Sequence, residues 1–257
     1  MRRLVYFLLL LVSAFSCISK KELVYMQNSN LKETVPTAIP SSYKAYKLQA
    51  NDVLSIKVQS LEPEISNIYN IIPPSSAFGF ADPGTMFLSG YTVDEAGNVN
   101  LPNVGKLKVE GLTITQTQEL IQRNIDRYIT NATVVVKLIS FRVNVLGEVQ
   151  RPGQYFIYND RATILEALSM AGDLSRGANR ENVKLVRQTP TGSEVVLLDL
   201  KDPNLVQSQY YYVMPNDVLY IEPSEALVKR DNLVGLNVAT LALSVISTAV
   251  LLLNYFK

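Results

Sequence analysis

The stretch FRVNVLGEVQRPGQYFIY, residues 141–158, decides the fold of the second half of the chain. Apolar residues alternate with polar ones on both sides of Arg151-Pro152-Gly153, a pattern typical of two strands that each bury one face. Proline suits the second position of a tight turn, and glycine suits the third. The stretch therefore predicts a β-hairpin that begins a folded unit.

Downstream, the sequence predicts one helix and further strands around this hairpin. Thr163 and Glu166 have the spacing of a capping box, and Gly172 is placed to end the short helix between them. The strands VKLVRQ and EVVLLDL flank a turn at residues 190–192, and PNDVLYI follows them. One helix among several strands favours a small α+β fold of β-grasp type over residues 141–224.

Upstream, residues 46–140 predict another small α+β unit. YKLQANDVLSIKV, from residue 46, and YTVDEAGNVNLPNVGKLKVEGLT, from residue 91, indicate short strands separated by turns. Thr115 and Gln118 have capping-box spacing before a helix, and the strand TVVVKLIS closes the unit. The apolar face of that helix is expected to consist of Leu120, Ile121, Ile125 and Ile129.

The string Asn-Asp-Val-Leu-x-Ile occurs twice, once in each unit, and brings Asp52 and Asp217 into equivalent positions. Two paired aspartates can be catalytic carboxylates, or they can be turn residues whose side chains accept hydrogen bonds from nearby backbone amides. We favour the turn, because Asn-Asp before an apolar run is ordinary turn chemistry.

Composition removes several classes of function. The chain has 24 Lys and Arg against 23 Asp and Glu and no basic run in its middle, so nucleic acid is not expected as a partner. It contains no His, no Trp and a single Cys, Cys17. Disulfides, Cys/His metal sites and histidine-dependent catalysis are therefore excluded. We expect no cofactor, no metal and no enzymatic activity.

The N-terminus has the layout of a secretory signal. Residues 1–16 contain two arginines, an apolar run too short to span a membrane, and then small residues. Cys17 follows, as the lipidated cysteine of a bacterial lipoprotein would. The alternative is ordinary signal cleavage, with the cysteine belonging to the signal by chance. Residues 17–45 are polar and contain proline, which predicts a tether from a membrane lipid anchor.

The C-terminus carries a second apolar run, residues 233–253, without a single charge. At 1.5 Å per residue a helix of this length matches a bilayer core of about 30 Å. Tyr255, Phe256 and Lys257 would suit the membrane interface. The sequence therefore predicts a C-terminal transmembrane helix over residues 230–254.

Polar residues within this run share one side of the expected helix. A face of small polar residues favours helix packing in a membrane, and it can also border water in an assembly of several copies. The second possibility makes these residues candidates for lining a pore. The candidates are Asn237, Thr240, Ser244, Ser247 and Thr248.

Several strings occur in a recognisable order: YKLQANDVLSIKV, GNVNLPNVGKLKVEGLT, VVVKL, VNVLGEVQRPGQY, TILEALSMAGDLSRGANRENVKLVR and PNDVLYI. In this order they resemble the bacterial polysaccharide export protein family. The first unit is similar to its export-signature domain, and the second to its soluble-ligand-binding β-grasp (SLBB) domain. The resemblance covers about residues 46–223. One β-grasp module is present where the longest members carry two.

The resemblance implies a passive conduit for a capsular or exopolysaccharide chain. Members are lipidated at the N-terminus, lie in the outer membrane with their soluble domains in the periplasm, and form homo-oligomeric, octamer-like rings whose C-terminal helices make the exit pore. It also implies an inner-membrane polysaccharide co-polymerase as partner.

Two other functions compete with this interpretation. The first is a periplasmic adaptor or glycan-binding lipoprotein whose C-terminal helix is only an anchor. The second is a secreted enzyme that uses the acid pair Asp94 and Glu95, or Asp199 and Asp202. Neighbouring acids of this kind more often belong to solvated turns, and no catalytic motif accompanies them.

Overall fold

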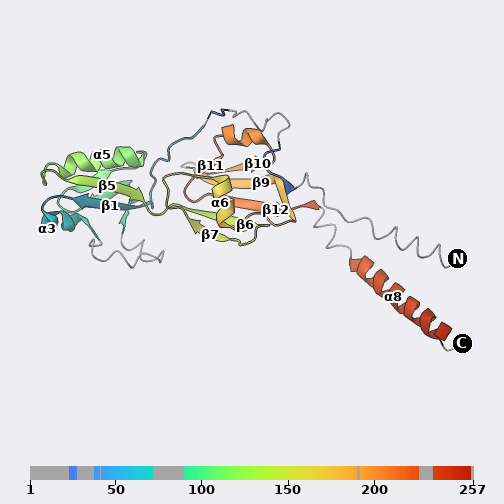
Figure 1. Ribbon diagram of the computed structural model, residues 1–257. Helices are drawn as coiled ribbons and strands as arrows, with labels where there is room; N and C mark the ends of the chain where they lie inside the picture. The colour runs from blue at the N-terminus through green and yellow to red at the C-terminus, as the bar shows by residue number, and fades with distance from the viewer. Residues whose placement is uncertain are drawn as a thin grey trace.

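A computed structural model describes residues 23–27, 38–40, 42–71, 90–189, 192–225 and 234–255. It contains two α+β domains that lie side by side, followed by a helix at the C-terminus (Figure 1). Each domain has its own hydrophobic core. The mixed α+β class expected from the sequence is confirmed.

The first domain is a three-stranded antiparallel sheet covered by a helix. Strand β1 occupies the centre of the sheet, between β2 and β5, and a separate hairpin pairs β3 with β4. The elements are β1 (Val53–Gln59), α3 (Pro63–Ser66), η1 (Asn67–Tyr69), β2 (Tyr91–Thr92), β3 (Asn98–Leu101), β4 (Gly105–Lys108), α5 (Ile114–Ile125) and β5 (Thr133–Leu138).

Helix α5 starts two residues earlier than its sequence suggested. The capping box consists of Thr113 and Gln116, which bond each other's backbone amides, so the predicted box at Thr115 and Gln118 is wrong. The Gln118 side chain instead accepts a hydrogen bond from the Val136 amide of β5, 3.2 Å away. The apolar face is as predicted: Ile121, Ile125 and Ile129 are buried in the core, and Leu120 packs against it.

The second domain is a five-stranded sheet in the order β10-β9-β12-β6-β7, packed against the short helix α6. Only β6 and β12 run parallel to each other, and the other neighbours are antiparallel. The elements are β6 (Arg142–Gly147), β7 (Gly153–Phe156), β8 (Ala162–Thr163), α6 (Ile164–Met170), β9 (Ala178–Thr189), β10 (Gly192–Leu198), η3 (Pro203–Gln207), β11 (Tyr212–Val213) and β12 (Val218–Pro223).

The hairpin and the capped helix of this domain are confirmed. Strands β6 and β7 pair in antiparallel register across the predicted turn. Thr163 and Glu166 form the capping box of α6, and Gly172 follows its C-terminus with φ of +78°. A glycine just beyond the helix adopts this left-handed conformation without the steric cost that a Cβ would add.

The C-terminal run is helical, as α8 (Val234–Tyr255). Within the described part of the chain, however, no helix combines the length and the apolar character that a membrane crossing requires. The transmembrane helix expected over residues 230–254 is therefore not supported.

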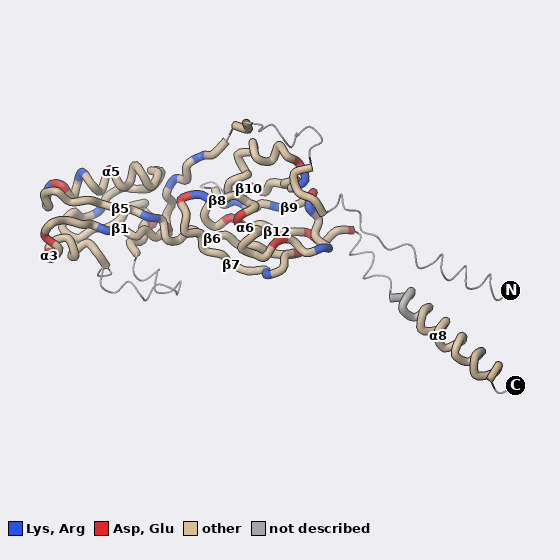
Figure 2. The backbone as a smooth tube through the Cα atoms, in the orientation of Figure 1, with Lys and Arg blue, Asp and Glu red and all other residues tan. Residues whose placement is uncertain are grey.

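Residues of both charge signs occur along the backbone of both domains (Figure 2). The described part of α8 carries no charge. This distribution agrees with the near balance of acids and bases in the sequence.

Candidate functional site

The repeated Asn-Asp string forms the same turn in both domains. Asn51 and Asn216 have φ of +70° and +66°, the left-handed conformation that asparagine tolerates. The carboxylates of Asp52 and Asp217 each accept a hydrogen bond from the backbone amide three residues earlier, at 2.9 and 2.7 Å. A strand starts directly after each turn. The two aspartates therefore act as turn residues, and the catalytic alternative has no geometric support.

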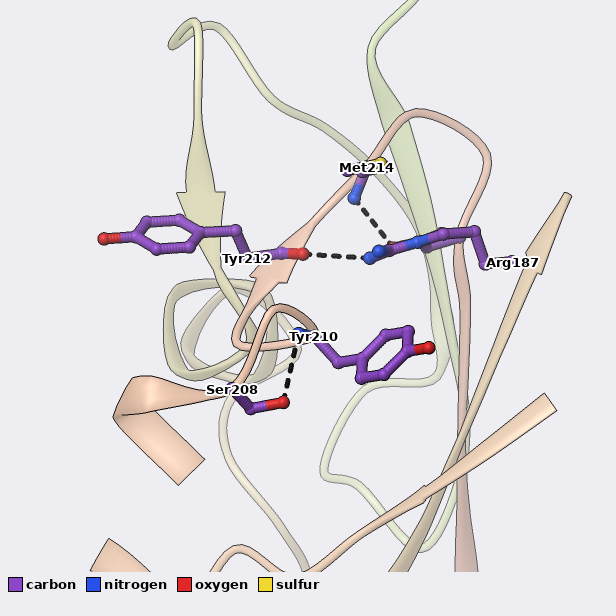
Figure 3. A network of polar contacts seen from close by, with 6 residues as sticks. Arg187, Ser208, Tyr210, Tyr212 and Met214 are labelled. Atoms are coloured by element: carbon purple, nitrogen blue, oxygen red, sulfur yellow. Dashed lines mark hydrogen bonds and ion pairs between the residues drawn. The ribbon is translucent and has the colours of Figure 1, made fainter. Parts of the chain in front are cut away.

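The turn in the second domain is fixed by a buried ion pair between Arg187 and Asp217. Figure 3 shows Arg187 beside the Tyr212 carbonyl and Met214 at this turn. Arg187 of β9 contacts the Asp217 carboxylate with both Nε and Nη2, at 3.0 and 2.8 Å. Nη2 also donates to the Tyr212 carbonyl, 2.9 Å away, and the guanidinium lies 5.6 Å from the centre of the Tyr210 ring. Burial raises the pKa of Asp217, and the arginine partly opposes that shift. The pair thus links β9 to the start of β12 and to β11.

The turn in the first domain has a neutral partner instead. The Tyr46 hydroxyl donates to Asp52 Oδ2 at 2.9 Å. Burial raises the pKa of Asp52, while hydrogen bonds from the Gln49 amide, Tyr46 and Ser140 lower it in part. Burial also raises the pKa of Tyr46, so this hydroxyl keeps its proton and remains a donor. The two related turns therefore differ in how each buried carboxylate is compensated.

The Gly-Glu-Val part of the string VNVLGEVQRPGQY also has a structural explanation. Gly147 has φ of +89°, and a Cβ there would come within 2.0 Å of the Ile221 carbonyl oxygen. The next amide, of Glu148, donates to the same oxygen at 3.0 Å, and the Glu148 carboxylate accepts from the Ser175 hydroxyl at 2.5 Å. Val149 then forms a bridge with Leu174. The string therefore joins the end of β6 to β12 and to the segment that follows α6.

The other acids considered for catalysis also stabilise turns. Asp94 accepts from the Asn98 amide at 2.8 Å, and this hydrogen bond lowers its pKa. Asp199 accepts from the Lys201 amide, and Asp202 caps η3, each at 2.8 Å. Within the described ranges, no three acidic or cysteine side chains gather as metal ligands would. Each of these three carboxylates has a local backbone role, and Glu95 is an exposed residue of a turn.

Two family models match successive parts of the chain. Residues 40–139 match the polysaccharide biosynthesis/export protein family, and residues 141–221 match the SLBB domain. The chain belongs to the polysaccharide export family. The resemblance inferred from its sequence strings is confirmed.

Two curated relatives of this chain are described as EPS I polysaccharide export outer membrane protein EpsA. The one from Ralstonia solanacearum is 31% identical over 180 residues, which cover 66% of this chain and 44% of the relative. The one from Ralstonia nicotianae is 33% identical over 136 residues, which cover 51% and 35%. The chain thus spans less than half the length of the curated relatives it matches.

The hydroxyl groups of α8 in this family member bond to their own helix. Ser244 donates to the Leu241 carbonyl at 2.8 Å, Thr248 donates to the Ser244 carbonyl at 2.7 Å, and Ser247 donates to the Leu243 carbonyl. All three residues are exposed. Their protons are therefore used internally, and the oxygen lone pairs remain to face outward.

The structure does not describe the side chains of two predicted site residues. Cys17 lies outside the described residues, and the side chain of Asn237 is not among those described. Thr240 is described and is exposed. The assignments of Cys17 to lipidation and of the five α8 residues to a pore stay predictions.

Part of the expected tether packs on the second domain, a contact that the sequence did not predict. The Tyr25 hydroxyl donates to the Asp173 carboxylate, and its ring lies 5.5 Å from the Arg180 guanidinium. The backbone amides of Met26 and Gln27 donate to the carbonyls of Leu200 and Lys201, at 3.0 and 2.7 Å. The sequence feature that could have predicted this contact is an aromatic residue in an otherwise polar tract, because such residues are often buried against another surface.

Proposed function

We propose that this chain is a subunit of an outer-membrane assembly that exports a capsular or exopolysaccharide. The observation that carries the proposal is the direct succession of the export domain and the SLBB domain, at residues 40–139 and 141–221. The relatives are named as outer membrane export proteins for EPS I polysaccharide, which supports the same place and class of cargo.

The assembly we propose is a homo-oligomeric, octamer-like ring that acts as a passive conduit. A glycan chain needs a continuous passage, and two small packed domains, each built around its own core, supply the wall of such a passage only when several copies surround it. Each acid named above as a catalytic candidate is engaged in a turn, which favours conduction over chemistry. An inner-membrane polysaccharide co-polymerase would deliver the chain to this ring.

Lipidation of Cys17 would hold the subunit at the inner leaflet of the outer membrane, with both domains in the periplasm. More than one acyl chain on the same cysteine makes such an anchor stable, since a single chain binds a bilayer only transiently. The mature cysteine would then also explain why the chain retains one unpaired thiol-bearing residue.

Deleting the gene in its native host is expected to remove the polysaccharide from the cell surface while its synthesis continues. Complementation with the unaltered chain should restore export. Cys17→Ser removes the thiol that would be acylated, so this variant should be detached from the membrane and should lower export. Surface carbohydrate and the membrane fraction of the protein are measured together. Unchanged surface polysaccharide after deletion would refute the proposal.

The rival function is that of a periplasmic adaptor whose helix α8 packs against another helix. It is favoured by one observation, that the hydroxyls of α8 donate to their own backbone, as they do in helices that meet apolar neighbours. Migration of the purified protein as a large detergent-stable ring would favour the conduit, and migration as a monomer would favour the adaptor.

The polar face of α8 provides a further test of the conduit. We propose that its residues border the passage, so replacing Ser244 and Thr248 together by leucine should lower export several-fold without preventing ring assembly. Uncharged hydroxyl groups exchange hydrogen bonds with a moving glycan, and leucine removes those contacts. Ala242→Leu with Ala249→Leu adds similar bulk on the opposite face and serves as the control. Equal export by both double variants would contradict the assignment.

A further inference from the structure

A pocket of about 210 Å³ lies at the junction of the two domains. Its lining includes the connection between β5 and β6, and both domains contribute residues to it. Apolar and polar side chains both belong to this lining. The lining residues are Tyr46, Ile114, Lys137, Leu138, Ile139, Phe141, Tyr158, Asn159, Asp160 and Pro215.

An ion pair crosses from one domain to the other at this pocket. Lys137, in β5 of the first domain, lies with its Nζ 3.0 Å from Oδ1 of Asp160, in the loop before β8 of the second domain. Both side chains are more than half exposed, at 57% and 67%. Exposed pairs of this kind contribute little to stability. The pair therefore matters here because it holds a cation and a carboxylate together beside the apolar residues of the pocket lining.

Next to this pair, the side chains of Tyr158 and Asn159 have polar groups that could bind a ligand. The Tyr158 residue is 77% exposed although it borders an apolar pocket. Within the described ranges, neither its hydroxyl nor the Asn159 side chain has a hydrogen-bond partner. An aromatic ring, an amide, an ammonium and a carboxylate thus surround one small cavity.

We propose that this junction pocket binds a single pyranose ring of the transported glycan. A pyranose has an apolar C–H face and a rim of hydroxyls. The apolar lining residues with Tyr158 match the first, and the polar groups of Lys137, Asn159 and Asp160 match the second. The volume is below the roughly 300–1,000 Å³ of pockets that enclose drug-sized ligands. It therefore suits one ring of a chain and not an oligosaccharide.

This inference rests on the proposed function for the identity of the cargo, but not for the pocket itself. A site exposed at its rim and limited to one ring should bind weakly, in the millimolar range, and so would not arrest a moving chain. Because its walls come from both domains, an occupied pocket would also oppose their separation. The site would thus act as a contact point for successive sugars at the interdomain junction.

The test is saturation-transfer NMR on the purified full-length protein, with D-glucose, D-galactose, N-acetyl-D-glucosamine and D-glucuronic acid as separate probes. The method detects weak binding to large assemblies because it observes the sugar. We expect transfer to at least one of the four. Tyr158→Ala should lower the affinity about five- to tenfold, as loss of one aromatic contact predicts. Tyr128→Ala, at an exposed tyrosine outside the pocket, is the control.

Absence of transfer to all four sugars would overturn the inference, and so would transfer that Tyr158→Ala leaves unchanged. Asp160→Asn provides an independent variant, since it keeps the shape of the side chain and should weaken binding while the fold persists. The gene-deletion experiment is separate. Normal export in the deletion strain, combined with Tyr158-dependent transfer, would refute the proposed function and leave the sugar site standing.

Discussion

Asp217→Asn is expected to lower the free energy of unfolding of the second domain by about 3–5 kcal/mol, the usual cost of removing one partner of a buried ion pair. The substitution leaves the Arg187 guanidinium, which is only 7% exposed, without its carboxylate. The remaining acceptor near it, the Tyr212 carbonyl, carries no compensating charge. The loss should appear as a lower urea midpoint, followed by near-ultraviolet circular dichroism of the tyrosines.

Asp52→Asn in the equivalent turn is the matched control, with an expected loss of about 1 kcal/mol or less, because its partners are neutral donors. Its pH dependence should also change. Burial raises the pKa of Asp52, so the folded state binds more protons than the unfolded state just below that pKa. The unaltered protein should therefore gain stability relative to Asp52→Asn as pH falls through that raised pKa toward the unfolded value. Equal midpoint losses for the two asparagine variants would refute the role of the ion pair.

Gly147→Ala should produce the second large effect, a loss of about 2–5 kcal/mol. A left-handed conformation costs a non-glycine residue about 1–2 kcal/mol, and forcing a methyl group into a filled space adds about 1–3 kcal/mol. Here the obstacle is the Ile221 carbonyl of β12, which is backbone and has little freedom to move. The parallel pairing of β6 and β12 should therefore weaken.

Gly105→Ala separates the conformational cost of the substitution from the cost of the steric contact. Gly105 has φ of +84°, and nothing lies within 4 Å of the position of its Cβ. The expected loss is therefore only the conformational part, about 1–2 kcal/mol. Urea unfolding of both variants checks the difference, and a loss at Gly105 as large as that at Gly147 would show that the contact with β12 contributes nothing.

Local patterns predicted the hairpin at residues 141–158 and the cap of α6, because the residues that decide them are neighbours in sequence. They failed at α5, where Thr-x-x-Gln occurs twice in overlapping positions, at Thr113 and at Thr115. The choice between them depends on tertiary contacts. Gln118 is engaged by the amide of Val136 in β5, which leaves Gln116 for the cap.

Local sequence patterns could not predict the side chains that contact the two Asn-Asp turns. The turns themselves are local and were predicted, but Arg187 lies 30 residues before Asp217, and nothing in its own segment marks it as buried. The same holds for Tyr25, whose partner Asp173 is 148 residues away. The junction pocket also combines residues from segments that are far apart, so only the folded chain brings them together.

The contacts of Tyr25 with Asp173 and Arg180 limit the distance between Cys17 and the second domain. Tyr25 lies eight residue steps after Cys17. A fully extended chain spans at most about 3.3–3.6 Å per residue, which limits this segment to under about 30 Å. With a lipid on Cys17, the second domain would therefore be confined to within one bilayer thickness of the leaflet. The first domain, on the far side of the second in Figure 1, would project deeper into the periplasm, toward the source of the glycan.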